Sequence, residues 1–199
     1  MKEIPVPIAV NNRHVHLSKD DARIIFGETY QFSSDPSQDK MLWPGHTLWK
    51  EKVALAGPTG TISKVSVLGP LERTSVEMSH ADAYRLGLQP QNMKAKKFGP
   101  GVTMIGPKGS VFLSTERAIN GRWLLASKIH ADKHGLKNGM RVDARVGEGD
   151  LATTFHGVEV IVDDDNPDRW ALYLDPDAAS AASASTGDTG HIRIVSDHS

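Results

Sequence analysis

Two histidines separated by one residue are the side chains in this sequence best suited to chemistry. The segment Asn12-Arg13-His14-Val15-His16-Leu17-Ser18 follows the apolar run Val6-Pro7-Ile8-Ala9-Val10. In a strand, side chains at i and i+2 leave the same face, so His14 and His16 can direct two imidazoles to one point. Zinc accepts neutral imidazole nitrogen at about 2.0–2.1 Å, and catalytic sites usually combine three protein ligands with an open position. The pattern predicts half of a metal site, with two unrelated histidines as the alternative interpretation.

A third ligand candidate is Glu77, in the segment Thr74-Ser75-Val76-Glu77-Met78-Ser79. This carboxylate lies between apolar residues in a strand-like stretch, where an isolated charge needs a partner. A metal ion would supply that partner. The alternative is an ordinary glutamate on the solvent face of a strand.

Composition excludes several classes of function. The 199 residues carry a formal net charge of -1, a pI near 6.8 and no cysteine. A neutral chain without a basic block argues against nucleic acid as a partner, and the lack of cysteine leaves His, Asp and Glu as the metal ligands. No apolar stretch approaches the roughly 20 residues of a membrane span, and the N-terminus lacks a long apolar leader. We therefore expect a cytoplasmic protein without a membrane partner.

Short strands dominate the hydrophobic pattern. Segments that alternate or run apolar, rich in β-branched residues and bounded by turn residues, occur at 52–56, 62–68, 141–146 and 158–162. Short helices are expected from Ser18, as N-cap, to Phe26 and from Ser79 to Leu86, with Gly87 as C-cap. The sequence predicts a mostly β fold in which short α-helices cap β-barrels.

Internal repetition suggests that the barrel is duplicated. The turns Gly57-Pro58-Thr59-Gly60 and Gly106-Pro107-Lys108-Gly109 are similar hairpin signals. Residues 13–17 are weakly similar in sequence to the segment Ser127-Lys128-Ile129-His130-Ala131. We expect two related β-barrel domains, one over residues 1–100 with the metal site and one over 101–199, with approximate boundaries that allow interleaved halves.

The chain resembles the PduL-type phosphate propanoyltransferases, the phosphotransacylases of bacterial microcompartments. The resemblance runs over nearly the whole chain and is strongest before residue 110. It rests on segment 12–18 and on Val67-Leu68-Gly69-Pro70, Val76-Glu77-Met78-Ser79, Asp82-Ala83, Gly106-Pro107-Lys108-Gly109 and Gly139-Met140-Arg141-Val142. It implies a pair of related β-barrels and a two-zinc site that moves an acyl group between coenzyme A and phosphate. By this resemblance, His14, His16 and Glu77 hold one zinc.

The resemblance breaks down at the second zinc. The family holds this ion with a second H-x-H and with a histidine that opens an H-x-D segment, and here these positions read Lys128-Ile129-His130 and Tyr173-Leu174-Asp175. Only His130 offers an imidazole. A protonated lysine cannot ligate, and a tyrosine phenol is a poor zinc ligand at neutral pH. We therefore expect a degenerate second site, in which Lys128 supplies positive charge if the protein is active.

The phosphate-binding arginine of the family has a shifted candidate in Arg73, because the interval from Gly69 to Glu77 is one residue shorter than usual. A guanidinium binds phosphate oxygens through two parallel hydrogen bonds, although a solvated turn arginine is the alternative. Arg13 is a second candidate, for phosphate or for support of the histidines. The mechanism expected is direct attack of phosphate on the thioester, since no cysteine or serine nucleophile is recognisable.

Two functions remain open. One is an acyl-CoA:phosphate acyltransferase that uses zinc. Its substrates are acyl-CoA, phosphate and acyl phosphate. Its expected partners are an acyl kinase or microcompartment proteins, and a homo-oligomer is possible. The other is a catalytically inactive relative that binds coenzyme A or a metal as a scaffold or regulator. No N-terminal encapsulation peptide is seen, which favours the cytoplasm over a microcompartment lumen.

Overall fold

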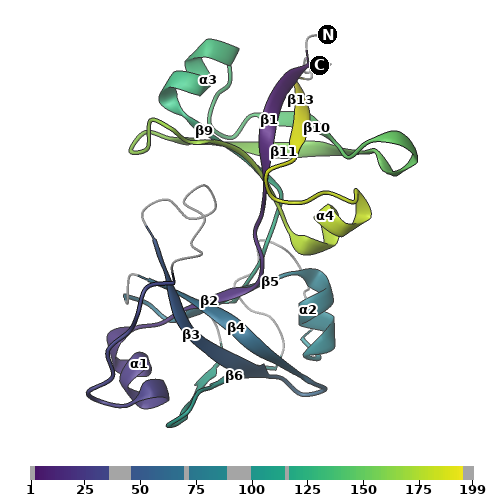
Figure 1. The fold of residues 1–199 in the computed structure, drawn as a ribbon. Helices are drawn as coiled ribbons and strands as arrows, with labels where there is room; N and C mark the ends of the chain where they lie inside the picture. The colour runs from purple at the N-terminus through teal and green to yellow at the C-terminus, as the bar shows by residue number, and fades with distance from the viewer. Residues whose placement is uncertain (1–2, 36–45, 70–71, 89–99, 115–116, 195–199) are drawn as a thin grey trace. The chain divides into compact units, whose positions relative to one another are not determined.

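A computed structural model of the protein describes residues 3–35, 46–69, 72–88, 100–114 and 117–194 (Figure 1). The chain divides into two compact units. Residues 1–11 and 121–199 form one unit, called the barrel unit, and residues 12–120 form the other, called the sheet unit. None of the described helices is long and apolar enough to cross a membrane.

The barrel unit is a closed ring of six strands in the order β1-β12-β9-β11-β10-β13. These strands are β1 (Ile4–Val10), β9 (Trp123–Ser127), β10 (Arg141–Val146), β11 (Thr153–Asp163), β12 (Trp170–Leu174) and β13 (Thr189–Ile194). Alternate residues such as Leu124, Val142 and Leu172 fill the interior and are fully buried. The closed ring confirms a mostly β fold built around a barrel.

The sheet unit contains seven strands in the order β7-β6-β3-β4-β2-β5-β8. They are β2 (His14–His16), β3 (Thr47–Ala56), β4 (Thr61–Gly69), β5 (Ser75–Met78), β6 (Val102–Ile105), β7 (Ser110–Leu113) and β8 (Arg117–Ile119). The two glycine-rich turns join β3 to β4 and β6 to β7 as hairpins, as the sequence predicted. The described strands of this unit form a curled, half-barrel sheet, where the sequence predicted a second barrel.

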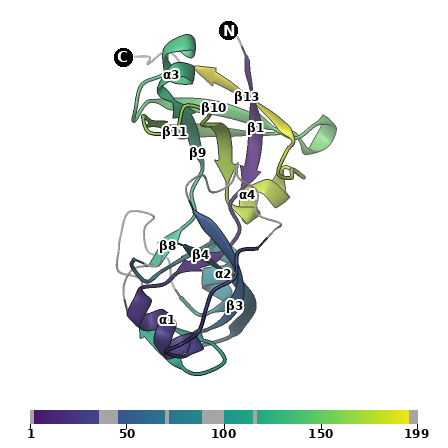
Figure 2. The ribbon, with the colours of Figure 1, turned by 60° about the vertical axis from the view of Figure 1, so that its left-hand side comes forward.

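Each helix begins directly after a strand and is capped by a short polar side chain. The helices are α1 (Lys19–Phe26), α2 (His80–Arg85), α3 (Lys128–His134) and α4 (Pro176–Ala181), with a 3-10 turn at Gly149–Leu151. Ser18, Ser79, Ser127 and Asp175 are their N-caps. Within the barrel unit, α3 and α4 lie at opposite ends of the barrel (Figures 1 and 2). The predicted first two helices are confirmed, except that α2 is capped at its C-terminus by Leu86, one residue before Gly87.

The two units share one pattern of strand pairing, which supports the predicted duplication. In the sheet unit, β2 pairs parallel with β4 and antiparallel with β5, which pairs parallel with β8. In the barrel unit, β9 pairs parallel with β11 and antiparallel with β12, which pairs parallel with β1. A capped helix follows β2, β5, β9 and β12 alike. The repeat therefore matches β2 with β9 and β5 with β12.

Candidate metal and phosphate site

Strand pairing brings His14, His16 and Glu77 to one face of the sheet unit. His14 lies directly opposite Glu77 in the β2–β5 register, and His16 leaves the same face of β2 two residues later. The alternating residues Val15 and Val76 point the other way and are fully buried in the core. Packing of this apolar face therefore fixes which way the three polar side chains point.

The three side chains form a cluster that could hold a metal ion. Their nearest ligand atoms all lie within 4.8 Å of one another. Nδ1 of His14 lies 2.9 Å from the carbonyl oxygen of Asn12, and a carbonyl only accepts, so Nδ1 carries the proton. Nε2 then carries a lone pair and lies 3.5 Å from a carboxylate oxygen of Glu77. Two acceptor atoms that face each other across this distance favour a cation between them, and the donor set fits zinc.

The environment of His16 keeps its ring neutral. Burial is the largest cause that lowers the pKa of His16 from 6.5 to about 4, followed by electrostatic interactions with the neighbouring His14, His46 and Arg73. A neutral imidazole is the form that binds a metal. His16 is therefore ready to act as a ligand at neutral pH without first losing a proton.

A cavity of about 400 Å³ lies beside the cluster. Its lining includes His16 and Glu77 from the cluster, together with His46, Glu72, Arg73 and Ser75. The structure thus brings Arg73, the predicted phosphate candidate, to the same cavity as the predicted metal ligands. His46 was not predicted as a site residue: it follows Pro44-Gly45 in sequence and is exposed, yet its ring centroid lies 5.6 Å from that of His16. No local sequence signal marks His46, because its contact with His16 joins segments that are distant in the sequence.

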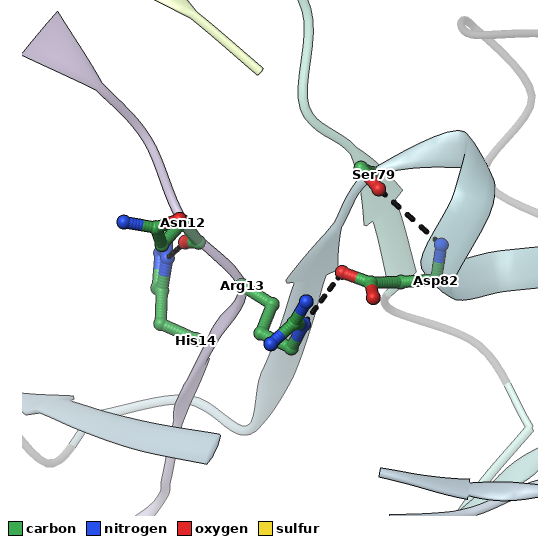
Figure 3. A network of polar contacts seen from close by, with 5 residues as sticks. All are labelled: Asn12, Arg13, His14, Ser79 and Asp82. Atoms are coloured by element: carbon green, nitrogen blue, oxygen red, sulfur yellow. Dashed lines mark hydrogen bonds and ion pairs between the residues drawn. The ribbon is translucent and has the colours of Figure 1, made fainter. Parts of the chain in front are cut away.

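Arg13 occupies a different position from Arg73. Its Nε donates to Asp82 at 2.7 Å, and Asp82 is a buried residue in the first turn of α2. The backbone N–H of Asp82 donates in turn to the side chain of Ser79, the cap of that helix. Figure 3 shows Arg13 reaching toward Asp82, while His14 lies beside the Asn12 carbonyl. Arg13 is thus paired with Asp82 and is not among the residues that line the cavity.

The positions predicted for a second zinc lie in the barrel unit. Lys128 and His130 belong to the first turn of α3, where Lys128 pairs with Asp132. His130 accepts or donates a hydrogen bond with the Ser127 hydroxyl at 2.9 Å, and its ring stacks on Trp170. Among the residues that the structure describes, the one cluster of three possible ligands is that of His14, His16 and Glu77.

The structural repeat identifies different counterparts of the metal cluster. The caps Ser18 and Ser127 correspond, so His14 and His16 match Trp123 and Leu125 of β9. The caps Ser79 and Asp175 correspond likewise, so Glu77 matches Tyr173.

Strand register supports this match, because Trp123 lies opposite Tyr173 as His14 lies opposite Glu77. The weak sequence similarity between 13–17 and 127–131 therefore does not follow the alignment of the structural repeat, which places His14 and His16 at Trp123 and Leu125. An indole, an aliphatic chain and a phenol do not fit a zinc ion.

Comparison with known proteins gives consistent matches. The family model described as phosphate propanoyltransferase matches residues 7–185. The phosphate propanoyltransferase of Thermotoga maritima is 36% identical over 196 residues, which cover 96% of this chain and 90% of that protein. Its counterpart from Rhodopseudomonas palustris is 36% identical over 179 residues, covering 88% and 76%. That of Citrobacter koseri is 33% identical over 194 residues, covering 94% and 88%.

Proposed function

The chain belongs to the phosphate propanoyltransferase family, and from this premise we propose that it transfers an acyl group between coenzyme A and phosphate, using one zinc ion. The observation that carries the proposal is the convergence of His14, His16 and Glu77 beside a cavity that Arg73 also lines. This arrangement combines a metal-ligand set with a phosphate-binding group in one place.

Zinc held by the three ligands would polarise the thioester carbonyl and stabilise the thiolate that leaves. Arg73 binds the phosphate and directs one oxygen toward the acyl carbon, so that the reaction becomes a positioned attack instead of a chance encounter. The new carbon–oxygen bond forms as the carbon–sulfur bond breaks, which yields acyl phosphate and coenzyme A. The Asn12 carbonyl fixes the proton on Nδ1 of His14 and thereby orients this ligand.

The substrates of this reaction are acyl-CoA, phosphate and acyl phosphate. Acyl phosphate is a reactive anhydride, so an acyl kinase is a fitting neighbour in the cytoplasm or in a microcompartment lumen. A homo-oligomer is compatible with the proposal.

The proposal is tested by measuring zinc content and acyl transfer on the same preparations. We expect purified protein to contain zinc and to form propanoyl phosphate from propanoyl-CoA and phosphate. His16→Ala should lose both properties, because two ligands hold zinc poorly. His156→Ala, an exposed histidine of the barrel unit, is the matched control and should keep both.

Two results would contradict the proposal. Zinc retained at undiminished affinity in His16→Ala would remove the assigned metal site. A zinc-loaded wild type that transfers neither propanoyl nor acetyl groups would favour the alternative, an inactive relative that binds coenzyme A or metal.

A further inference from the structure

His46 lines the cavity of the candidate site but does not belong to the metal cluster. Its ring makes an edge contact with that of His16, at a centroid distance of 5.6 Å, and both rings line the same cavity of about 400 Å³. The group of ligand atoms within 4.8 Å of one another contains His14, His16 and Glu77 but not His46. Its place beside the cluster therefore calls for a different role from metal binding.

The other groups around the cavity indicate what that role is. Arg73 and Ser75 line it as hydrogen-bond donors, whereas Glu72 and Glu77 contribute negative charge. An anion such as phosphate binds only where hydrogen-bond donors and positive charge exceed the negative charge of the nearby carboxylates. A zinc ion bound to Glu77 would neutralise the charge of that carboxylate. A neutral imidazole keeps one N–H donor on the ring, so His46 can add a directional hydrogen bond without needing a charge.

We propose that His46 binds the phosphoryl group of the substrate together with Arg73, as a further substrate-binding residue of this site. The inference rests on the proposed function and names the part of the site that recognises inorganic phosphate and acyl phosphate. Arg73 presents a planar fork that engages two phosphate oxygens, which leaves other oxygens for single donors. His46 is exposed and lines the cavity, and it does not belong to the apolar core of the sheet unit.

The test is a titration of zinc-loaded protein with inorganic phosphate, in which binding is measured by calorimetry or by the phosphorus NMR signal. This measurement needs no turnover. We expect His46→Ala to raise the phosphate dissociation constant roughly tenfold, the effect of losing one hydrogen bond to a charged group. His46→Gln keeps an N–H donor and should restore most of the affinity. Zinc content should stay unchanged in both variants, and His156→Ala should behave as the wild type.

Three results would overturn this inference. The first is an unchanged dissociation constant in His46→Ala. The second is loss of zinc from His46→Ala, which would make His46 a metal ligand. The third is the absence of measurable phosphate binding to the zinc-loaded wild type.

Failure of the proposed function is a separate result, namely no acyl transfer by a wild type that binds phosphate. Where transfer is measurable, His46→Ala should raise the phosphate KM with little change in the KM for acyl-CoA.

Discussion

His16 is half-buried and lies beside His14, His46 and Arg73, and this environment lowers its pKa. We expect the metal-free protein to be sensitive to acid for this reason. The pKa of His16 is about 4 in the folded protein and about 6.5 in the unfolded chain. Between these values the unfolded chain binds more protons, so the free energy of unfolding rises with pH. The contribution of neutral His16 to the free energy of unfolding is fully present above about pH 6.5 and is lost as the pH falls toward 4.

We therefore expect the metal-free wild type to lose stability between pH 6.5 and 4 more steeply than His16→Asn, which has no group to titrate there. Urea unfolding at pH 7.5, 5.5 and 4.5 measures this difference. Carboxylates of the protein also titrate in this pH range, and His16→Asn controls for them because it keeps all of them. Parallel pH profiles for the two proteins would contradict the neutral state assigned to His16.

Arg73 is the residue at which charge and shape can be separated. Arg73→Lys keeps the positive charge but loses the planar fork, so we expect phosphate use to weaken by roughly 1–3 kcal/mol, the scale of a charged hydrogen bond. Zinc content should not change. Steady-state kinetics with phosphate varied at saturating acyl-CoA measure the effect. An unchanged phosphate KM and turnover would mean that phosphate binds elsewhere.

At the scale of elements, the link between Arg13 and Asp82 joins the start of β2 to the first turn of α2. Asp82 is buried, whereas Arg13 keeps more than a third of its side chain exposed. Without Arg13, the desolvation cost of the buried Asp82 carboxylate is no longer offset by a positive partner. Removal of both side chains removes this cost as well. The link therefore helps to hold the chain just before His14.

A double-mutant cycle of Arg13→Ala and Asp82→Ala should show a coupling energy of about 1–2 kcal/mol in urea unfolding. Arg13→Ala should also weaken zinc binding moderately, since His14 follows directly, but should leave the phosphate KM nearly unchanged. A large rise in the phosphate KM would instead assign Arg13 to substrate binding.

Local sequence patterns predicted the elements that depend on local chemistry. The H-x-H spacing in a strand, the serine cap of α1, the presence of α2 and the two glycine-rich hairpins are confirmed. Each of these features depends on neighbours within a few residues. His46 could not be predicted in this way, since its contact with His16 arises between segments 30 residues apart in the sequence.

The repeat register was also hidden from the sequence. Trp123, Leu125 and Tyr173 share no side-chain chemistry with His14, His16 and Glu77, and only strand pairing and the helix caps reveal the match.

At the scale of the whole molecule, the two units repeat one pattern of strands and helices but differ in the residues at the equivalent of the metal cluster. The sheet unit presents two imidazoles and a carboxylate there, and the barrel unit presents Trp123, Leu125 and Tyr173. The repeated strand pattern thus carries the candidate ligands in one unit and aromatic or aliphatic groups in the other. If transfer is observed, its metal chemistry depends on the sheet unit.

We therefore predict one tightly bound zinc per chain, measured by metal analysis after dialysis. Trp123→His combined with Leu125→His should add a second zinc of lower affinity, because these positions share the i and i+2 geometry of His14 and His16. Lys128→His, which creates an H-x-H within α3, is the matched control and should add none, since residues two apart on a helix point in different directions. If the double variant is unfolded by circular dichroism, Leu125→His with the native Tyr173 gives a milder test for added zinc affinity. A wild type with two zinc ions per chain, the second lost on His130→Ala, would contradict both the stoichiometry and the repeat register.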